Sequence, residues 1–91
     1  SIKTPLRITG LQPNPTADIS QLTFEVTEAL RLRVDLYTMS GLHVNELFDG
    51  MATTDVVYQL PIDVANLSAG MYQIRLSGDA FGVVRKLLVS P

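Results

Sequence analysis

The chain has 91 residues, of which 46% are hydrophobic and 18% charged, and its formal net charge is -2. We therefore expect one folded domain over residues 1–91, with a strand-rich core over residues 6–89, that buries about 60% of its unfolded surface. The acidic balance argues against nucleic acid as a partner, the lack of cysteine excludes disulfides and thiolate metal sites, and no run approaches the roughly 18 apolar residues of a membrane span.

Two predicted strands flank a proline-rich segment near the start of the chain. Residues 6–8 predict a short strand that ends at Thr9-Gly10, and residues 22–26 alternate between apolar and polar side chains as a second strand does. Pro13-Asn14-Pro15 predicts an ordered crossover or an edge, because proline donates no backbone hydrogen bond. Ile19 has the opposite parity to the second strand, so we expect a bulge shortly after it.

Residues 30–36 show the cleanest alternation in the chain. One face is entirely leucine and valine, and the other carries two arginines and an aspartate. This pattern predicts a strand at the centre of its sheet, followed by a turn over residues 37–41. The only histidine, His43, follows the glycine of that turn and is expected to be an exposed loop residue.

The next predicted elements are shorter. Residues 44–48 suggest a fourth strand that ends at Asp49-Gly50, since this dipeptide is a common turn signal. Residues 51–55 then read as a polar loop. Residues 56–62 alternate as a fifth strand, and Pro61 places that strand at an edge or near its own end.

A tight corner followed by an alternating strand occupies residues 63–76. Gly70 is suited to a positive φ angle, and Tyr72 begins the apolar face of the sixth strand. A tyrosine directly after a corner suggests the tyrosine corner of immunoglobulin-like sandwiches, in which the hydroxyl bonds to backbone upstream.

The last strand differs from the others because both of its faces carry aliphatic side chains. Residues 78–82 predict a hairpin loop, and residues 83–89 a strand in which Val83, Leu87 and Val89 lie on one face and Val84 and Leu88 on the other. Either set can fill the core and leave the other as an apolar strip. In total, about seven antiparallel strands with regular turn signals predict an all-β, immunoglobulin-like β-sandwich.

No motif in the chain predicts catalysis, a metal site or a cofactor. His43 has no serine or cysteine partner at a catalytic spacing, and no glycine-rich phosphate loop is present. The loop carboxylates match no calcium-binding pattern and are better explained as turn formers; they are Asp49, Asp55, Asp63 and Asp79. We therefore expect a domain that is not an enzyme.

Two non-catalytic functions are compatible with these residues. The sandwich can serve as a structural accessory module of a larger secreted enzyme. It can also bind carbohydrate through exposed rings, for which Tyr37, Phe48 and Phe81 are the candidates, although core or corner packing explains each of them equally well.

Four motifs follow one another in a fixed order. They are Pro13-Asn14-Pro15, Val34-Asp35-Leu36-Tyr37 through Gly41 to Val44, Asp63 to Leu76, and Lys86-Leu87-Leu88-Val89. Together they resemble the C-terminal sorting domain (type A) of the type IX secretion system, also called the Por secretion system. The third motif matches the family pattern Asp-x-x-x-Leu-x-x-Gly-x-Tyr-x-x-x-Leu. The chain departs from the family at Thr38, where aspartate is common, at Leu42, where arginine is frequent, and at Ser90-Pro91, where a basic residue often closes the domain.

The resemblance implies a signal that directs a cargo protein, N-terminal to this domain, through the periplasm and across the outer membrane of a Gram-negative bacterium. It implies an outer-membrane shuttle and a sortase-like peptidase as partners, with removal of the domain or its exchange for a surface anchor, so that the cargo is secreted or held at the cell surface. We expect translocon recognition by Gly78, Gly82, Val84, Lys86, Leu87, Leu88 and Val89. We expect maintenance of the fold by Pro13, Asn14, Pro15, Tyr37, Gly41, Asp63, Leu67, Gly70 and Tyr72.

Overall fold

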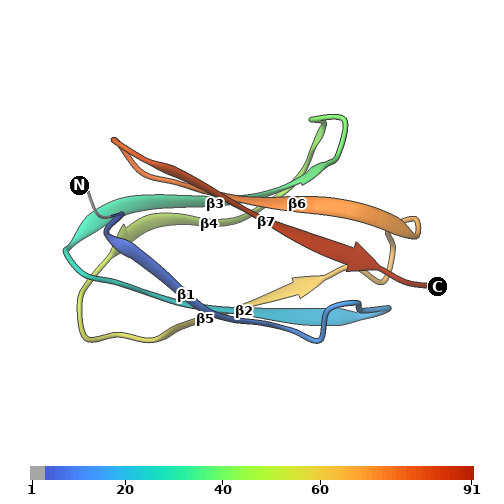
Figure 1. The fold of residues 1–91 in the computed structure, drawn as a ribbon, viewed down its shortest axis with the longest axis horizontal. Coiled ribbons are helices and arrows are strands. Elements are labelled where there is room, and N and C mark those ends of the chain that lie inside the picture. Colours follow the sequence, from blue (N-terminus) through green and yellow to red (C-terminus); the bar gives the residue numbers. More distant parts are fainter. Residues whose placement is uncertain (1–3) are drawn as a thin grey trace.

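A computed structural model describes residues 4–91, which form two packed antiparallel sheets (Figure 1). Every element in these residues is a strand. In chain order the strands are β1 (Leu6–Gln12), β2 (Ile19–Val26), β3 (Leu30–Thr38), β4 (His43–Ala52), β5 (Tyr58–Asp63), β6 (Gly70–Ser77) and β7 (Gly82–Val89). Within residues 4–91 there is no helix of the length and hydropathy that a membrane crossing requires.

One sheet has the strand order β1-β2-β5, and the other has the order β4-β3-β6-β7. The arrangement confirms the predicted all-β, immunoglobulin-like sandwich of seven strands. It also confirms that residues 30–36 belong to a central strand, because β3 lies between β4 and β6. β5 is an edge strand, as Pro61 indicated, and β7 is the edge of the four-stranded sheet.

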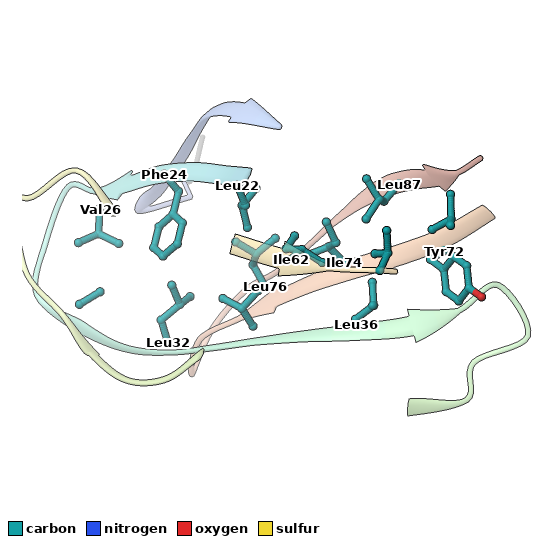
Figure 2. Close-up of a cluster of buried hydrophobic side chains, with 14 residues drawn as sticks. Leu22, Phe24, Val26, Leu32, Leu36, Ile62, Tyr72, Ile74, Leu76 and Leu87 are labelled. Atoms are coloured by element: carbon teal, nitrogen blue, oxygen red, sulfur yellow. The ribbon is translucent and has the colours of Figure 1, made fainter. Parts of the chain in front are cut away.

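The core fills the space between the two sheets (Figure 2). The strands with clean alternation turn their apolar faces to this layer. The core residues are Leu22, Phe24, Val26, Leu32, Val34, Leu36, Ala52, Ile62, Val64, Tyr72, Ile74, Leu76, Leu87 and Val89. At one end the ring of Phe24 stacks on Tyr58, with centroids 5.1 Å apart, and meets Phe48 edge-on at 6.2 Å. Such pairs add about 0.5–1.5 kcal/mol to the effect of burial alone.

Two expectations about the first sheet are wrong. Thr9-Gly10 does not end the first strand; β1 continues to Gln12, and the register shifts between Ile8 and Gly10, which makes a bulge. No bulge follows Ile19, since β2 pairs with β5 without interruption from its first residue. Ile19 instead points outward and is 48% exposed, and Ser20 takes the inward position. Ser20 is fully buried, and its hydroxyl donates to the carbonyl of Pro13 at 2.8 Å, which satisfies it in the core.

The fourth strand is longer than predicted. Asp49-Gly50 forms no turn: Asp49 pairs with Arg33 and Gly50 with Leu32, and β4 runs on to Ala52. The ladder between β3 and β4 absorbs two register shifts, at residues 34/35 and 36/37, so simple alternation fails to describe β4. The connecting loop is consequently confined to residues 53–57, and residue 56, expected to open the fifth strand, lies in that loop.

Candidate functional site

Of the two possible arrangements of the last strand, the structure has Leu87 and Val89 in the core and Val84 and Leu88 outside. Leu87 is fully buried and Val89 is 3% exposed, whereas Val84 is 48% and Leu88 37% exposed. Since Val84 and Leu88 point away from the core, they form part of the outer face of the four-stranded sheet. This face of β6 and β7 is the candidate docking surface.

Met71 extends the apolar strip, which sequence analysis missed. It lies directly opposite Leu88 in the ladder between β6 and β7, and it is 42% exposed. In the sequence Met71 shares the parity of Gln73 and Arg75, so it reads as one residue of a polar face. Only the register of β6 against β7 reveals that it adjoins the aliphatic side chains of the last strand.

Polar and basic side chains continue the same surface. Gln73 lies opposite the exposed Lys86, and Arg75 lies opposite Val84. Gln73 donates through Nε2 to the carbonyl of Thr38 at 3.0 Å, and the guanidinium of Arg75 lies over the ring of Tyr37, 4.1 Å from its centroid. These contacts hold the β6 side of the surface in place, while Lys86 takes part in no ion pair within residues 4–91.

The tip of the hairpin between β6 and β7 diverges from β3 and β4 (Figure 1). The amide of Gly78 donates to the carbonyl of Phe81 at 3.1 Å, which closes the loop. A Cβ at Gly78 would collide with the ring of Phe81, so any larger residue there requires this ring to shift. Gly82 has open space around it, and no such requirement applies to it.

The Pro13-Asn14-Pro15 motif lies against the outer edge of β7. The side-chain amide of Asn14 donates to the carbonyl of Lys86 at 3.1 Å and accepts from the amide of Leu88 at 3.0 Å. Thr16 follows with two backbone hydrogen bonds. Its amide donates to the carbonyl of Leu88 at 3.0 Å, and its carbonyl accepts from the amide of Ser90 at 2.8 Å. The motif thus acts as a short substitute strand beside the C-terminal half of β7.

The third motif builds the corner before β6. The amide of Ala65 donates to the carboxylate of Asp63 at 3.0 Å, and Leu67 packs against the core. Gly70 has a φ of +150°. The hydroxyl of Tyr72 donates to the carbonyl of Ser68 at 2.7 Å, which is the geometry of the predicted tyrosine corner.

The second motif shapes the turn between β3 and β4. Tyr37 and Thr38 are still part of β3, so the turn is shorter than predicted and spans residues 39–42. Gly41 occupies the left-handed region with a φ of +96°. The hydroxyl of Thr38 accepts from the amide of Leu42 at 3.1 Å, and this oxygen closes the turn at the position where the family commonly has aspartate.

A buried carboxylate on the outer face also escaped sequence analysis. Asp35 is only 4% exposed, and its oxygens lie 2.9 Å from Nε of Arg33 and 2.9 Å from Nε2 of His43. Burial by itself raises the pKa of the Asp35 carboxyl, but hydrogen bonds from His43 and Arg33 outweigh it, so the pKa lies below its ordinary value. His43 is exposed as predicted, but it begins β4 and is not a loop residue.

The candidate rings for sugar binding are engaged in packing. Phe48 contacts Phe24 and Tyr58, Arg75 covers Tyr37, and Phe81 packs against the core and closes its own hairpin. Across residues 4–91, no three histidine, aspartate or glutamate side chains gather into a metal site. Two open hollows lie beside the last hairpin. One, of about 280 Å³, is lined by polar and charged residues and Gly78, and the other, of about 410 Å³, is lined by both polar and apolar residues.

Comparison with protein families identifies a match to this chain. A family model described as a secretion system C-terminal sorting domain matches residues 11–90, which includes all four motifs and the whole candidate docking surface. No curated protein matches the chain.

Proposed function

The chain belongs to the family of secretion system C-terminal sorting domains, the sorting signals of the type IX secretion system, and we propose that the outer face of β6 and β7 is the surface that the secretion machinery recognises. A sorting signal of this kind implies a type IX secretion machinery, a cargo N-terminal to it, and export of that cargo from the cell or to its surface. It is not itself catalytic.

The finer steps belong to the same proposal. Residues 1–91 act as one sorting domain that passes through the periplasm with its cargo. An outer-membrane shuttle binds the domain, and a sortase-like peptidase afterwards removes it or exchanges it for a surface anchor. The docking surface serves binding by the outer-membrane shuttle. The family match over residues 11–90 supports this sequence of events.

The distribution of charge over the outer face supports the choice of β6 and β7. On the β3 and β4 half, Arg31 pairs with Asp49 at 2.8 Å, and Asp35 is engaged by two partners. These charged residues are therefore compensated within the domain, whereas Glu46 of β4 takes part in no ion pair among the described residues. On the β7 half, Lys86 stands free of ion pairs among the described residues, beside exposed Val84 and Leu88. An exposed apolar patch rimmed by polar side chains is typical of a protein–protein interaction site.

Other residues of the four motifs hold this surface in position. Leu87 and Val89 anchor β7 in the core, and Asn14 fixes the edge of the strand from outside. The corner at Tyr72 sets where β6, the neighbour of β7, begins. These contacts support a structural role for the first and third motifs, and the exposure of Lys86 and Leu88 supports the proposed recognition role of the fourth.

The test is the location of a reporter in a host with this secretion system. A fluorescent protein fused to Ser1–Pro91 behind an export peptide should reach the surface or the medium, and Val84→Ser with Leu88→Ser should leave it in the periplasm. Ile19→Ser with Val57→Ser is the matched control, because Ile19 is as exposed as Val84 but lies in the other sheet. Both pairs should change stability by less than about 1 kcal/mol, as surface substitutions do. Equal export of the two variants would reject the proposed surface.

A further inference from the structure

The backbone of β7 offers hydrogen-bonding groups on its free side. In an antiparallel ladder alternate residues direct their N–H and C=O groups to opposite sides of the strand. The carbonyl of Lys86 and the amide of Leu88 bond to Asn14, on the side of β7 away from β6. The backbone N–H and C=O groups that point to this free side therefore belong to Gly82, Val84, Lys86 and Leu88.

The outward backbone groups in the C-terminal half of β7 are hydrogen-bonded, whereas the outward amides in its N-terminal half are not. From the carbonyl of Lys86 onward, each outward group is bonded: Asn14 and Thr16 take the groups of Lys86 and Leu88, and the amide of Ser90 bonds to Thr16. Before that point, the amides of Val84 and Lys86 have no partner within residues 4–91. The carbonyl of Val84 accepts only from the Nη1 of its neighbour Arg85, at 3.0 Å.

The other three sheet edges carry features that discourage strand addition. β1 is interrupted by the bulge between Ile8 and Gly10, the ladder to β4 shifts register twice, and β5 has Pro61 on its free side. Proteins use bulges, prolines and short strands to protect edges in this way. Among the described strands, the regular and uncovered stretch of edge is therefore Gly82–Lys86.

We propose, on the basis of the docking function above, that Gly82–Lys86 accepts an extended strand of the secretion machinery as an additional strand of the four-stranded sheet. The strand carries an acidic residue opposite Lys86 and an apolar residue opposite Val84, since opposite charges and apolar pairs stabilise cross-strand neighbours. Asn14 sets where the added strand stops. A second copy of the domain is a poor occupant, because Arg85 and Lys86 would bring like charges to the same interface.

Amide hydrogen exchange of the free domain tests the division of the edge. The amides of Val84 and Lys86 should exchange quickly, and those of Leu88 and Ser90 slowly. Asn14→Ala should speed exchange at Leu88 and leave Val84 unchanged. Slow exchange at Val84 and Lys86 in a monomeric sample would overturn the proposal, because the edge would then already be occupied.

Proline substitution tests the docking itself. Val84→Pro removes an outward amide without removing a bond to β6, and Gln59→Pro does the same on the free side of β5. We expect Val84→Pro to lower the export of the reporter about tenfold, as the loss of a backbone hydrogen bond and its register would. Gln59→Pro should have little effect. Val84→Thr changes the side chain but retains the amide, so the difference from Val84→Pro isolates the backbone.

Lys86→Pro, compared with Lys86→Gln, repeats the measurement at the second free amide. This pair tests strand addition if Val84→Pro lowers the melting temperature of the domain. A folded Val84→Pro variant that is exported as well as Val84→Thr would overturn strand addition while the sorting function stands. Failure of the unsubstituted fusion to leave the periplasm would instead reject the sorting function itself. A dimer in sedimentation that Val84→Pro abolishes would make a second copy the occupant and also overturn the proposal.

Discussion

The hydroxyl of Tyr72 ties the start of β6 to the corner before it, and Tyr72→Phe removes that tie alone. The ring is 8% exposed and lies at one end of the core, with its oxygen at the margin (Figure 2). The hydroxyl group donates to the carbonyl of Ser68 at 2.7 Å. Phenylalanine retains the ring and its packing, so the change in unfolding free energy reports the hydrogen bond.

The expected loss follows from the surroundings of the acceptor. Ser68 is exposed, so water reaches its carbonyl once the hydroxyl is gone, and no buried acceptor is left unsatisfied. The cost is then that of one ordinary hydrogen bond, about 1 kcal/mol. For a domain of this size, 1 kcal/mol lowers the melting temperature by about 4–8 °C.

Thermal unfolding followed by circular dichroism measures the shift. Tyr37→Phe is the control, because the hydroxyl of Tyr37 makes no hydrogen bond within residues 4–91 and the contact of its ring with Arg75 persists. The control should melt within about 1 °C of the wild type. An equally small shift for Tyr72→Phe would refute the stabilising role of the corner.

Three further predictions concern the strand, the hairpin and the outer face. Leu87→Ala should cost about 2–5 kcal/mol in urea titrations and Leu88→Ala about 0.5 kcal/mol or less; similar costs would contradict the orientation of β7. Gly78→Ala should cost about 1–3 kcal/mol, since the hairpin ring must move, whereas Gly82→Ala should not, and equal melting temperatures would argue against the packing of the loop. The pKa of Asp35 is lowered below 3.8 by folding, so the unfolded chain binds more protons and stability rises with pH. The advantage over Asp35→Asn should be full above about pH 5 and shrink as the pH falls below 3.8; a gap independent of pH would contradict this.

The strands that sequence analysis predicted best are those with one buried face. Alternation places β3 and β6 correctly because every second side chain of these strands enters the core. Alternation does not reveal a strand's inner face where a polar residue is buried with its own partner, as Ser20 is, or where a bulge breaks the period, as in β4. Asp49-Gly50 has the composition of a turn, yet ladder pairing with β3 holds it extended.

Only part of the docking surface could be predicted from the sequence. The aliphatic residues on both faces of the last strand suggested that one set lies outside the core. The contribution of Met71 and the closure of the edge by Asn14 depend on which strands are neighbours, and that is a property of the fold. The same holds for Asp35, whose partners come from its own strand and from the start of the next.

The most direct measurement is photo-crosslinking in cells that export the reporter fusion. A photoreactive amino acid is placed at Leu88 on the docking surface, and in a second fusion at Ile19, which is similarly exposed in the other sheet. We predict a covalent adduct with a component of the outer-membrane machinery from position 88 and none from position 19. An adduct from position 19 alone, or equal adducts from both positions, would contradict recognition through the outer face of β6 and β7.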